Sequence, residues 1–289
     1  MINPQYYHVL CNVLLDINLL TKESEIGNYM LEKISDVLNT EAASIFVIRD
    51  EGRIFPIAAF GVPLRILEEQ RFSVGKGIVG WVAQNAKSAI VKDPPKEDQR
   101  FDPSYDQITG FTTKSIVAAP ILFGTKIKGV IEFLNKKNAT FDEGDEQFLT
   151  LIGRAVGSAF EKAKLHTALE QSEILKQATI ECLTAGLITV DPTMIVMLYN
   201  QRAEDILRSS GCSIKAGMAI EDYRSVCPGM VDAIKSVLIS RKPLNRQEAF
   251  LESGGMKKHI GYSCVPVIRK DDSLLGATFF FQDITDLKK

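Results

Sequence analysis

Apolar side chains recur every three or four residues in two segments at the start of the chain. Residues 6–20 form the first segment and residues 24–39 form the second. This period predicts two amphipathic helices, the second with Ser24 as its N-cap.

Two later stretches each hold a pair of apolar runs around a short turn. They are residues 41–61, with a turn at Asp50-Glu51-Gly52, and residues 115–137. Each predicts a β-hairpin. Between them, residues 91–113 are polar and without periodicity, and loops of that length inside a compact domain are usually functional or disordered. We therefore expect a ligand first at this loop.

Residues 142–183 predict a helix longer than one domain face needs. A helix that links two domains and pairs with a second copy of the chain explains this length. The alternative is a helix broken near Gln171-Ser172. The apolar stripe on this helix consists of Phe148, Ile152, Val156, Ala159, Ala163, Leu165, Leu169 and Leu175.

The remaining chain predicts a small mixed domain, with a hairpin across Asp191-Pro192, a short helix at 201–210, a helix at 228–240 and strands within 247–283. The fold class is therefore α+β, with two domains joined by a long helix, each with a central antiparallel sheet flanked by helices. The expected parts are a first domain at 1–165, a helical linker at 166–183 and a second domain at 184–289.

Composition narrows the classes of function. The chain has 289 residues and a formal net charge of −2, so it has no electrostatic footprint for nucleic acid. No apolar run reaches membrane-spanning length and the N-terminus does not resemble a leader, so we expect a cytoplasmic protein that does not enter a membrane. Five scattered cysteines and three unpaired histidines predict neither disulfides nor a metal site, and leave only a lone histidine as a conceivable haem ligand.

The stretch from Gly75 to Lys92 contains the pattern G-x-G-x-x-G-x-V. A protein kinase also needs H-R-D and D-F-G motifs, which the chain lacks. A dinucleotide site needs a buried strand before the first glycine, and residues 67–74 are too polar for one. What remains is a tight glycine turn followed by a short helix with Ile78, Val82 and Ala83 facing inward. Its N-terminus suits a phosphate, but it also suits simple packing.

Residues 5–165 resemble a GAF domain, on the basis of the segments "ASIFVIRD", "VGKGIVGWVAQN", "TGFTTKSIVAAPI" and "GVIEFLNKKNATFDEGDEQF". The last segment matches the N-K-x(n)-F-x3-D-E signature of the cyclic-nucleotide-binding subgroup, found in phosphodiesterases and bacterial adenylyl cyclases. The resemblance implies that this motif supports the pocket without touching the nucleotide, and we expect an ion pair between Lys136 and Asp145. The competing interpretation is that the motif only holds parts of the domain together and that the domain binds no ligand. The motif positions are Asn135, Lys136, Phe141, Asp145 and Glu146.

The resemblance also implies a set of ligand contacts. Phe60 is expected to offer a face for a purine, Ser44 and Glu132 hydrogen bonds to base edges, and residues 78–79 their amides to the phosphate. The ligand would be cyclic AMP or cyclic GMP, and the choice stays open because Gly61 replaces an acidic residue seen in members that bind cyclic GMP. The expected contacts are Ser44, Phe60, Ile78, Val79, Asp106, Thr109, Thr113 and Glu132.

Residues 174–289 resemble a PAS domain, on the basis of "GLITVD", "YNQRAEDIL" and "LLGATFFFQDITDLKK". The flavin-adduct cysteine motif is absent and residues 228–240 contain no histidine, so an unliganded, dimerising or small-molecule-binding domain is expected.

Together these resemblances imply a regulatory sensor without a covalently bound cofactor. It would bind a cyclic nucleotide in the first domain and relay that event, through a homodimeric helix, to the PAS domain and then to an effector domain or partner protein. The alternative is a GAF–PAS module that senses another metabolite or serves only in dimerisation or in regulating a partner. We do not expect an enzyme, because no nucleophile–base pair, metal cluster or carboxylate dyad stands out.

Overall fold

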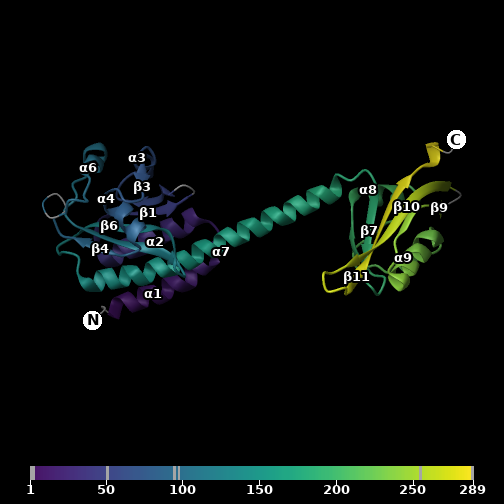
Figure 1. The fold of residues 1–289 in the computed structure, drawn as a ribbon, viewed down its shortest axis with the longest axis horizontal. Coiled ribbons are helices and arrows are strands. Elements are labelled where there is room, and N and C mark those ends of the chain that lie inside the picture. The colour runs from purple at the N-terminus through teal and green to yellow at the C-terminus, as the bar shows by residue number, and fades with distance from the viewer. Residues whose placement is uncertain (1–3, 50–51, 94–95, 97, 254–255, 288–289) are drawn as a thin grey trace. The chain divides into compact units, whose positions relative to one another are not determined.

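The computed structural model describes residues 4–49, 52–93, 96, 98–253 and 256–287. It divides into two compact units, an N-terminal unit of Met1–Glu170 and a C-terminal unit of Gln171–Lys289. Helix α7 (Glu143–Glu181) begins in the first unit and ends in the second (Figure 1). None of the described helices is both long and apolar enough to cross a lipid bilayer.

The N-terminal unit is built on one antiparallel sheet with the strand order β3-β2-β1-β6-β5-β4. The predicted hairpins are confirmed as the pairs β1–β2 and β5–β6. Of the first predicted turn, Asp50 and Glu51 lie outside the described residues. The strands are β1 (Thr40–Ile48), β2 (Arg53–Phe60), β3 (Phe72–Ser73), β4 (Ala89–Val91), β5 (Ile116–Phe123) and β6 (Lys126–Lys136).

Both faces of this sheet are covered, because its strands alternate apolar side chains toward two separate cores. Ala43, Ile45 and Val47 of β1 pack on the side of α1 (Pro4–Asp16), α2 (Glu23–Leu38) and α7, which we term the α7 face. Phe46 packs with Ile78 and Val82 of α4 (Gly77–Asn85) on the opposite side, the α4 face. The predicted N-cap at Ser24 is wrong, since α2 begins one residue earlier, after Lys22.

Helix α7 is continuous through Gln171, as a long linking helix requires, so the alternative of a helix broken near Gln171-Ser172 is wrong. The first part of its apolar stripe, from Phe148 to Ala163, is buried in the core of its own unit. Gly157 allows the helix to approach β5, since a Cβ at this position would lie 2.1 Å from the Leu122 carbonyl oxygen. This first part of the stripe therefore belongs to the core of the N-terminal unit and is not available to a second copy.

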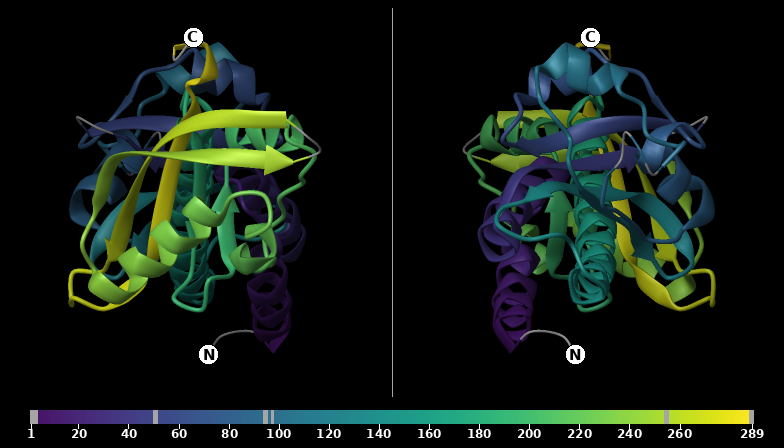
Figure 2. Two further views of the ribbon diagram at one scale, coloured as in Figure 1. Left: turned by 90° about the vertical axis from the view of Figure 1, so that its right-hand side faces the viewer. Right: turned by 90° about the vertical axis from the view of Figure 1, so that its left-hand side faces the viewer.

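The C-terminal unit has a five-stranded antiparallel sheet in the order β8-β7-β11-β10-β9. Helix α9 (Pro228–Ser240) packs across one face, as the left view of Figure 2 shows, and it spans the residues that the sequence predicts. The expected fold class, two antiparallel sheets flanked by helices with a long helix between them, is confirmed. The remaining elements are β7 (Gly186–Val190), β8 (Val196–Tyr199), α8 (Gln201–Arg208), η3 (Ile220–Tyr223), β9 (Leu244–Ser253), β10 (Met256–Ile268), β11 (Leu274–Asp283) and η4 (Thr285–Leu287).

Candidate ligand-binding site

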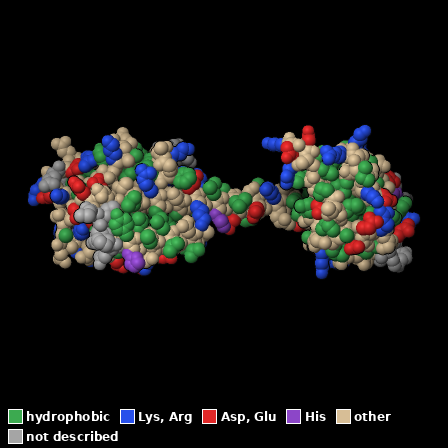
Figure 3. All heavy atoms as spheres, turned by 90° about the horizontal axis from the view of Figure 1, so that it is seen from below, with side chains coloured by type: hydrophobic (Ala, Val, Ile, Leu, Met, Phe, Trp, Pro, Cys, Tyr) green, Lys and Arg blue, Asp and Glu red, His purple; other side chains and the backbone are tan. Residues whose placement is uncertain are grey.

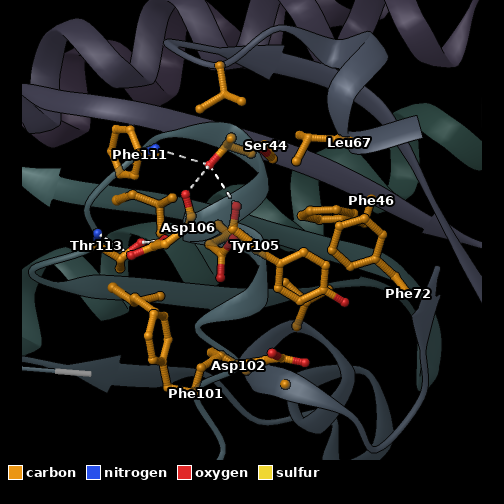
Figure 4. A pocket seen from close by; sticks show the side chains of 18 of the residues that line it. Ser44, Phe46, Leu67, Phe72, Phe101, Asp102, Tyr105, Asp106, Phe111 and Thr113 are labelled. Atoms are coloured by element: carbon orange, nitrogen blue, oxygen red, sulfur yellow. Dashed lines mark hydrogen bonds between the residues drawn. The ribbon is translucent and has the colours of Figure 1, made fainter. Parts of the chain in front are cut away.

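A cavity of about 80 Å³ lies on the α4 face, enclosed by the sheet, α4 and residues 98–113, which we term the lid (Figure 4). One water molecule needs about 10–15 Å³ of such space, so the cavity has room for several. The lid contains the short helix α6 (Ser104–Thr109). The lining residues are Ser44, Phe46, Val62, Leu67, Phe72, Lys76, Gly77, Ile78, Val79, Phe101, Asp102, Tyr105, Asp106, Thr109, Phe111, Thr113, Ile116, Glu132 and Leu134.

The polar floor of the cavity follows from strand register. Ser44 of β1 lies directly opposite Glu132 of β6, and Ala118 of β5 lies on the other side of Glu132. Directly paired residues present their side chains on the same face of a sheet. The two predicted floor residues, Ser44 and Glu132, are therefore brought together.

The glycine motif shapes the wall that α4 provides. Gly75 and Gly77 have φ values of 85° and 70°, a region that non-glycine side chains disfavour. Gly80 is needed for a different reason, because a Cβ there would lie 2.3 Å from the Ser73 carbonyl oxygen. The turn brings the first residues of α4, Ile78 and Val79, to the cavity wall. The amides of a helix's first turn lack intrahelical partners and can therefore receive an anion.

The lid is held closed by contacts with the body of the unit. The Tyr105 ring stacks on Phe72 with 4.8 Å between ring centroids and 7° between planes. The Arg100 guanidinium lies 4.2 Å from the Trp81 ring centroid, a cation–π contact.

A charge pair joins the lid to the glycine turn. The Lys76 Nζ lies 3.5 Å from a carboxylate oxygen of Asp102. The hydroxyl and amide of Ser104 donate to that carboxylate and, together with Lys76, lower the pKa of Asp102. Asp102 is thus an ionised carboxylate beside the Lys76 ammonium group, at the wall of the cavity.

The polar side chains of the predicted lid residues form hydrogen bonds within the lid. The amide and the hydroxyl of Thr113 donate to the Asp106 carboxylate at 2.7 and 2.6 Å (Figure 4). The Thr109 hydroxyl donates to the Tyr105 carbonyl at 2.8 Å and accepts from the Phe111 amide at 3.2 Å. In this closed arrangement these groups fix the shape of the lid.

Glu132 has an unusual environment. Burial, and secondarily the negative charge of Asp106, raise the pKa of the Glu132 carboxyl to about 7. Three other polar residues line the cavity near Glu132. Ser44 lies beside it on the neighbouring strand, and Asp106 and Thr113 are hydrogen-bonded to each other.

Asn135, from the signature motif, anchors the end of the lid. It is buried and adopts a φ of 55°. Its side-chain oxygen accepts from the amides of Lys114 and Ser115, and its side-chain nitrogen donates to the Thr112 carbonyl and to Glu41, each at 2.7 Å.

Lys136 and Asp145 form the expected ion pair, with 2.6 Å between nitrogen and oxygen. Asp145 is fully buried at the start of α7, where it also accepts from the Asp142 amide and from the Tyr6 hydroxyl of α1. This contact raises the pKa of Tyr6, after the larger effect of burial. The pair therefore ties β6, α7 and α1 together. Tyr6 was not predicted, and no sequence pattern marked it.

The other two motif residues are also structural. Phe141 is buried in the core of the α7 face, and Glu146 accepts from the Ser88 hydroxyl at 2.5 Å. None of the five motif residues lines the cavity.

Seven of the eight expected ligand contacts line the cavity, and Phe60 does not. Phe60 pairs with Ala43, and Ser44 pairs with Ala59, so register places Phe60 on the α7 face. The aromatic surfaces of the cavity come instead from Phe46, Phe72, Phe101, Tyr105 and Phe111. The signal that could have found Phe101, Tyr105 and Phe111 is the presence of three aromatic residues in the predicted loop of residues 91–113.

Comparison with known proteins identifies the class of the N-terminal unit. Residues 21–161 match the family model of the GAF domain. The fold is similar to the GAF domain of a phosphoenolpyruvate-protein phosphotransferase from Coxiella burnetii, with a TM-score of 0.51 and 17% identity over 56% of this chain and 96% of that one. The N-terminal unit therefore contains a GAF domain.

Curated relatives give a more particular similarity. The chain is 34% identical over 116 residues to the probable 3',5'-cyclic phosphodiesterase pde-5 of Caenorhabditis elegans, covering 40% of this chain and 16% of the relative. It is 25% identical over 255 residues to the dual 3',5'-cyclic-AMP and -GMP phosphodiesterase 11A of Takifugu rubripes, covering 77% and 27%. The GAF domain is homologous to those of cyclic-nucleotide phosphodiesterases, and the chain spans about a quarter or less of the length of these two relatives.

Proposed function

We propose that this chain is a regulatory sensor that binds a cyclic nucleotide in the cavity beneath the lid. The observation that supports it most is a cavity lined by seven of the eight positions expected to contact such a ligand. Homology to phosphodiesterase GAF domains points to the same class of ligand.

The charges of the cavity suit a ligand with one anionic end. Lys76 and the amides at the start of α4 form a cationic wall. The carboxyl group of Glu132 lies at the polar floor, where the negative charge of Asp106 helps to raise its pKa. A phosphate would therefore bind at α4, with the base toward Glu132.

The lid must move for such a ligand to enter. Pockets that enclose drug-sized ligands usually measure about 300–1,000 Å³, well above the present cavity. The Lys76–Asp102 pair and the Tyr105–Phe72 stack are the contacts that opening would break. Binding would then favour a second lid position, and this difference between two states is what a sensor needs.

We further propose that the C-terminal unit is a PAS domain and that α7 pairs with a second copy to relay binding to it. In chain order, helices α8 and α9 come between the second and third strands of the unit, β8 and β9, whose sheet is antiparallel and five-stranded; this order is in keeping with the resemblance in sequence. Leu165 and Leu169 of α7 are 62% and 58% exposed, so they are available to a partner helix. The output would pass to an effector domain or partner protein, and we propose no catalytic role for this chain.

Isothermal titration calorimetry with cyclic AMP and cyclic GMP tests the ligand. We expect saturable heat with at least one nucleotide, lost or strongly reduced in a Val79→Pro variant that removes one amide of the α4 wall. Pro is tolerated in the first turn of a helix, and circular dichroism checks that the variant is folded. Folded wild-type protein that releases no heat with either nucleotide would refute the proposal.

A smaller metabolite is the second candidate, because the closed cavity is small. A thermal-shift screen that places small metabolites beside cyclic and linear nucleotides separates the two. A ligand that stabilises the protein while both cyclic nucleotides fail would favour this second candidate.

A further inference from the structure

Glu132 places a carboxyl group at the floor of a largely apolar cavity. No hydrogen bond or ion pair holds its carboxyl oxygens among the described residues, whereas Asp106 and Asp102 in the same cavity are each held by two donors. The Glu132 side chain is half-buried, and its carboxyl group is free to bind a group that a ligand brings.

The groups around Glu132 do not favour its charge. Ser44 flanks it on β1 and Ala118 on β5, and neither is titratable. The lid contributes Asp106 and Tyr105, of which the first repels a carboxylate, and the cation Lys76 is engaged with Asp102. Near neutral pH a large fraction of the molecules thus holds Glu132 as the neutral acid.

A neutral carboxylic acid offers one donor and one acceptor side by side. Adenine presents the complementary pair, an amino donor beside a ring-nitrogen acceptor, and this is why an amide side chain such as Gln reads adenine with two hydrogen bonds. Guanine instead presents its ring N–H beside its amino group, two donors that suit an ionised carboxylate.

We infer that Glu132, as the neutral acid, selects adenine over guanine, so that the cavity prefers cyclic AMP to cyclic GMP. This inference rests on the proposed function and supplies the choice of base that the sequence leaves open. The preference for cyclic AMP is present at acidic pH and declines as the pH rises through about 7, where Glu132 ionises. The affinity of the site for cyclic AMP therefore depends on pH as well as on the concentration of the nucleotide.

Calorimetry with both nucleotides at about pH 6 and about pH 8 tests this inference. If only the acid form binds cyclic AMP, its affinity falls about tenfold over that interval, in proportion to the fraction of the acid form. Glu132→Gln carries the same donor and acceptor at every pH, so we expect it to retain cyclic AMP binding with less than about a twofold change between the two pH values. Glu132→Ala removes both groups, so it should discriminate poorly between the nucleotides at either pH.

Each outcome has a distinct meaning. An affinity ratio of the two nucleotides that does not change with pH in the wild type, or a Gln variant that loses cyclic AMP as the Ala variant does, would overturn the inference and leave the proposed function standing. Absence of binding by either nucleotide to folded wild-type protein would overturn the proposed function, and this inference with it. No histidine lines the cavity, so histidine titration does not act directly on the ligand.

Discussion

At the scale of single residues, two ion pairs join the same strand to the same helix but differ in their surroundings. Lys136 of β6 pairs with Asp145 of α7, and Lys128 of β6 pairs with Glu161 of α7. Asp145 is fully buried, while the second pair lies nearer the surface. Removal of one partner from a buried pair leaves an uncompensated charge, whereas an exposed pair contributes little.

We therefore expect Lys136→Met to lower the free energy of unfolding of the N-terminal unit by about 3 kcal/mol. Lys128→Met is the matched control and should have a much smaller effect. Urea unfolding followed by circular dichroism measures both. If Lys136→Met lowers the free energy of unfolding as little as Lys128→Met does, Asp145 is stabilised mainly by the Tyr6 hydroxyl and the Asp142 amide rather than by the lysine.

Residue-scale contacts also mark the limit of prediction from sequence. The Lys136–Asp145 pair follows from the motif because both partners are close in the chain. Phe60 was placed in the cavity wrongly, because whether a strand residue faces one side or the other depends on register. A shift of one residue reverses that side. Tyr6 could not be predicted, since it reaches Asp145 across 139 positions of sequence.

At the scale of elements, the lid would compete with the proposed ligand. The Asp102 carboxylate lies beside Lys76, at the wall where the phosphate would bind. The lowered pKa of Asp102, due first to the Ser104 hydroxyl, means that its charge persists at neutral pH. The phosphate of the proposed ligand would therefore meet a like charge and would have to displace it from the lysine.

Asp102→Asn keeps the side-chain oxygen that accepts from Ser104 but removes the charge. We expect cyclic-nucleotide affinity to rise severalfold, since an exposed charge pair is worth up to about 1 kcal/mol. Asp93→Asn is the control, because this residue pairs with Lys96 and does not line the cavity. Fluorescence or calorimetric titration gives both affinities, and a variant at residue 102 that binds no better than the control would contradict the competition.

Element types were predictable from the sequence for physical reasons. The hairpins and the helix Pro228–Ser240 follow from periodicity and from turn residues or proline at their ends. The lid was located by its length and polarity, but its internal bonds were not, because residues 98–113 have no repeating pattern. Their conformation depends on partners such as Phe72 and Asn135 elsewhere in the chain.

At the scale of the whole molecule, the exposed part of α7 carries apolar side chains on two opposite sides. Beyond Ala163 the helix is no longer buried in its unit, and Leu165, Leu169 and Ile174 are all strongly exposed. A groove on the N-terminal unit is lined by Leu165 and Leu169 together with Phe123, and Figure 3 shows hydrophobic side chains gathered on the surface of this unit. At about 100° per residue, Ile174 lies on the side of the helix opposite Leu165.

If α7 dimerises through the face of Leu165 and Leu169, the wild type should sediment with twice the mass of one chain. The double variant Leu165→Glu/Leu169→Glu should then dissociate to monomers, because two like charges would face their copies across an apolar seam. Ile174→Glu adds a charge at a comparably exposed position on the opposite side and should remain dimeric. Sedimentation equilibrium distinguishes these states. A monomeric wild type would refute the dimeric relay, and dissociation by Ile174→Glu instead of the double variant would move the interface to the opposite side of the helix.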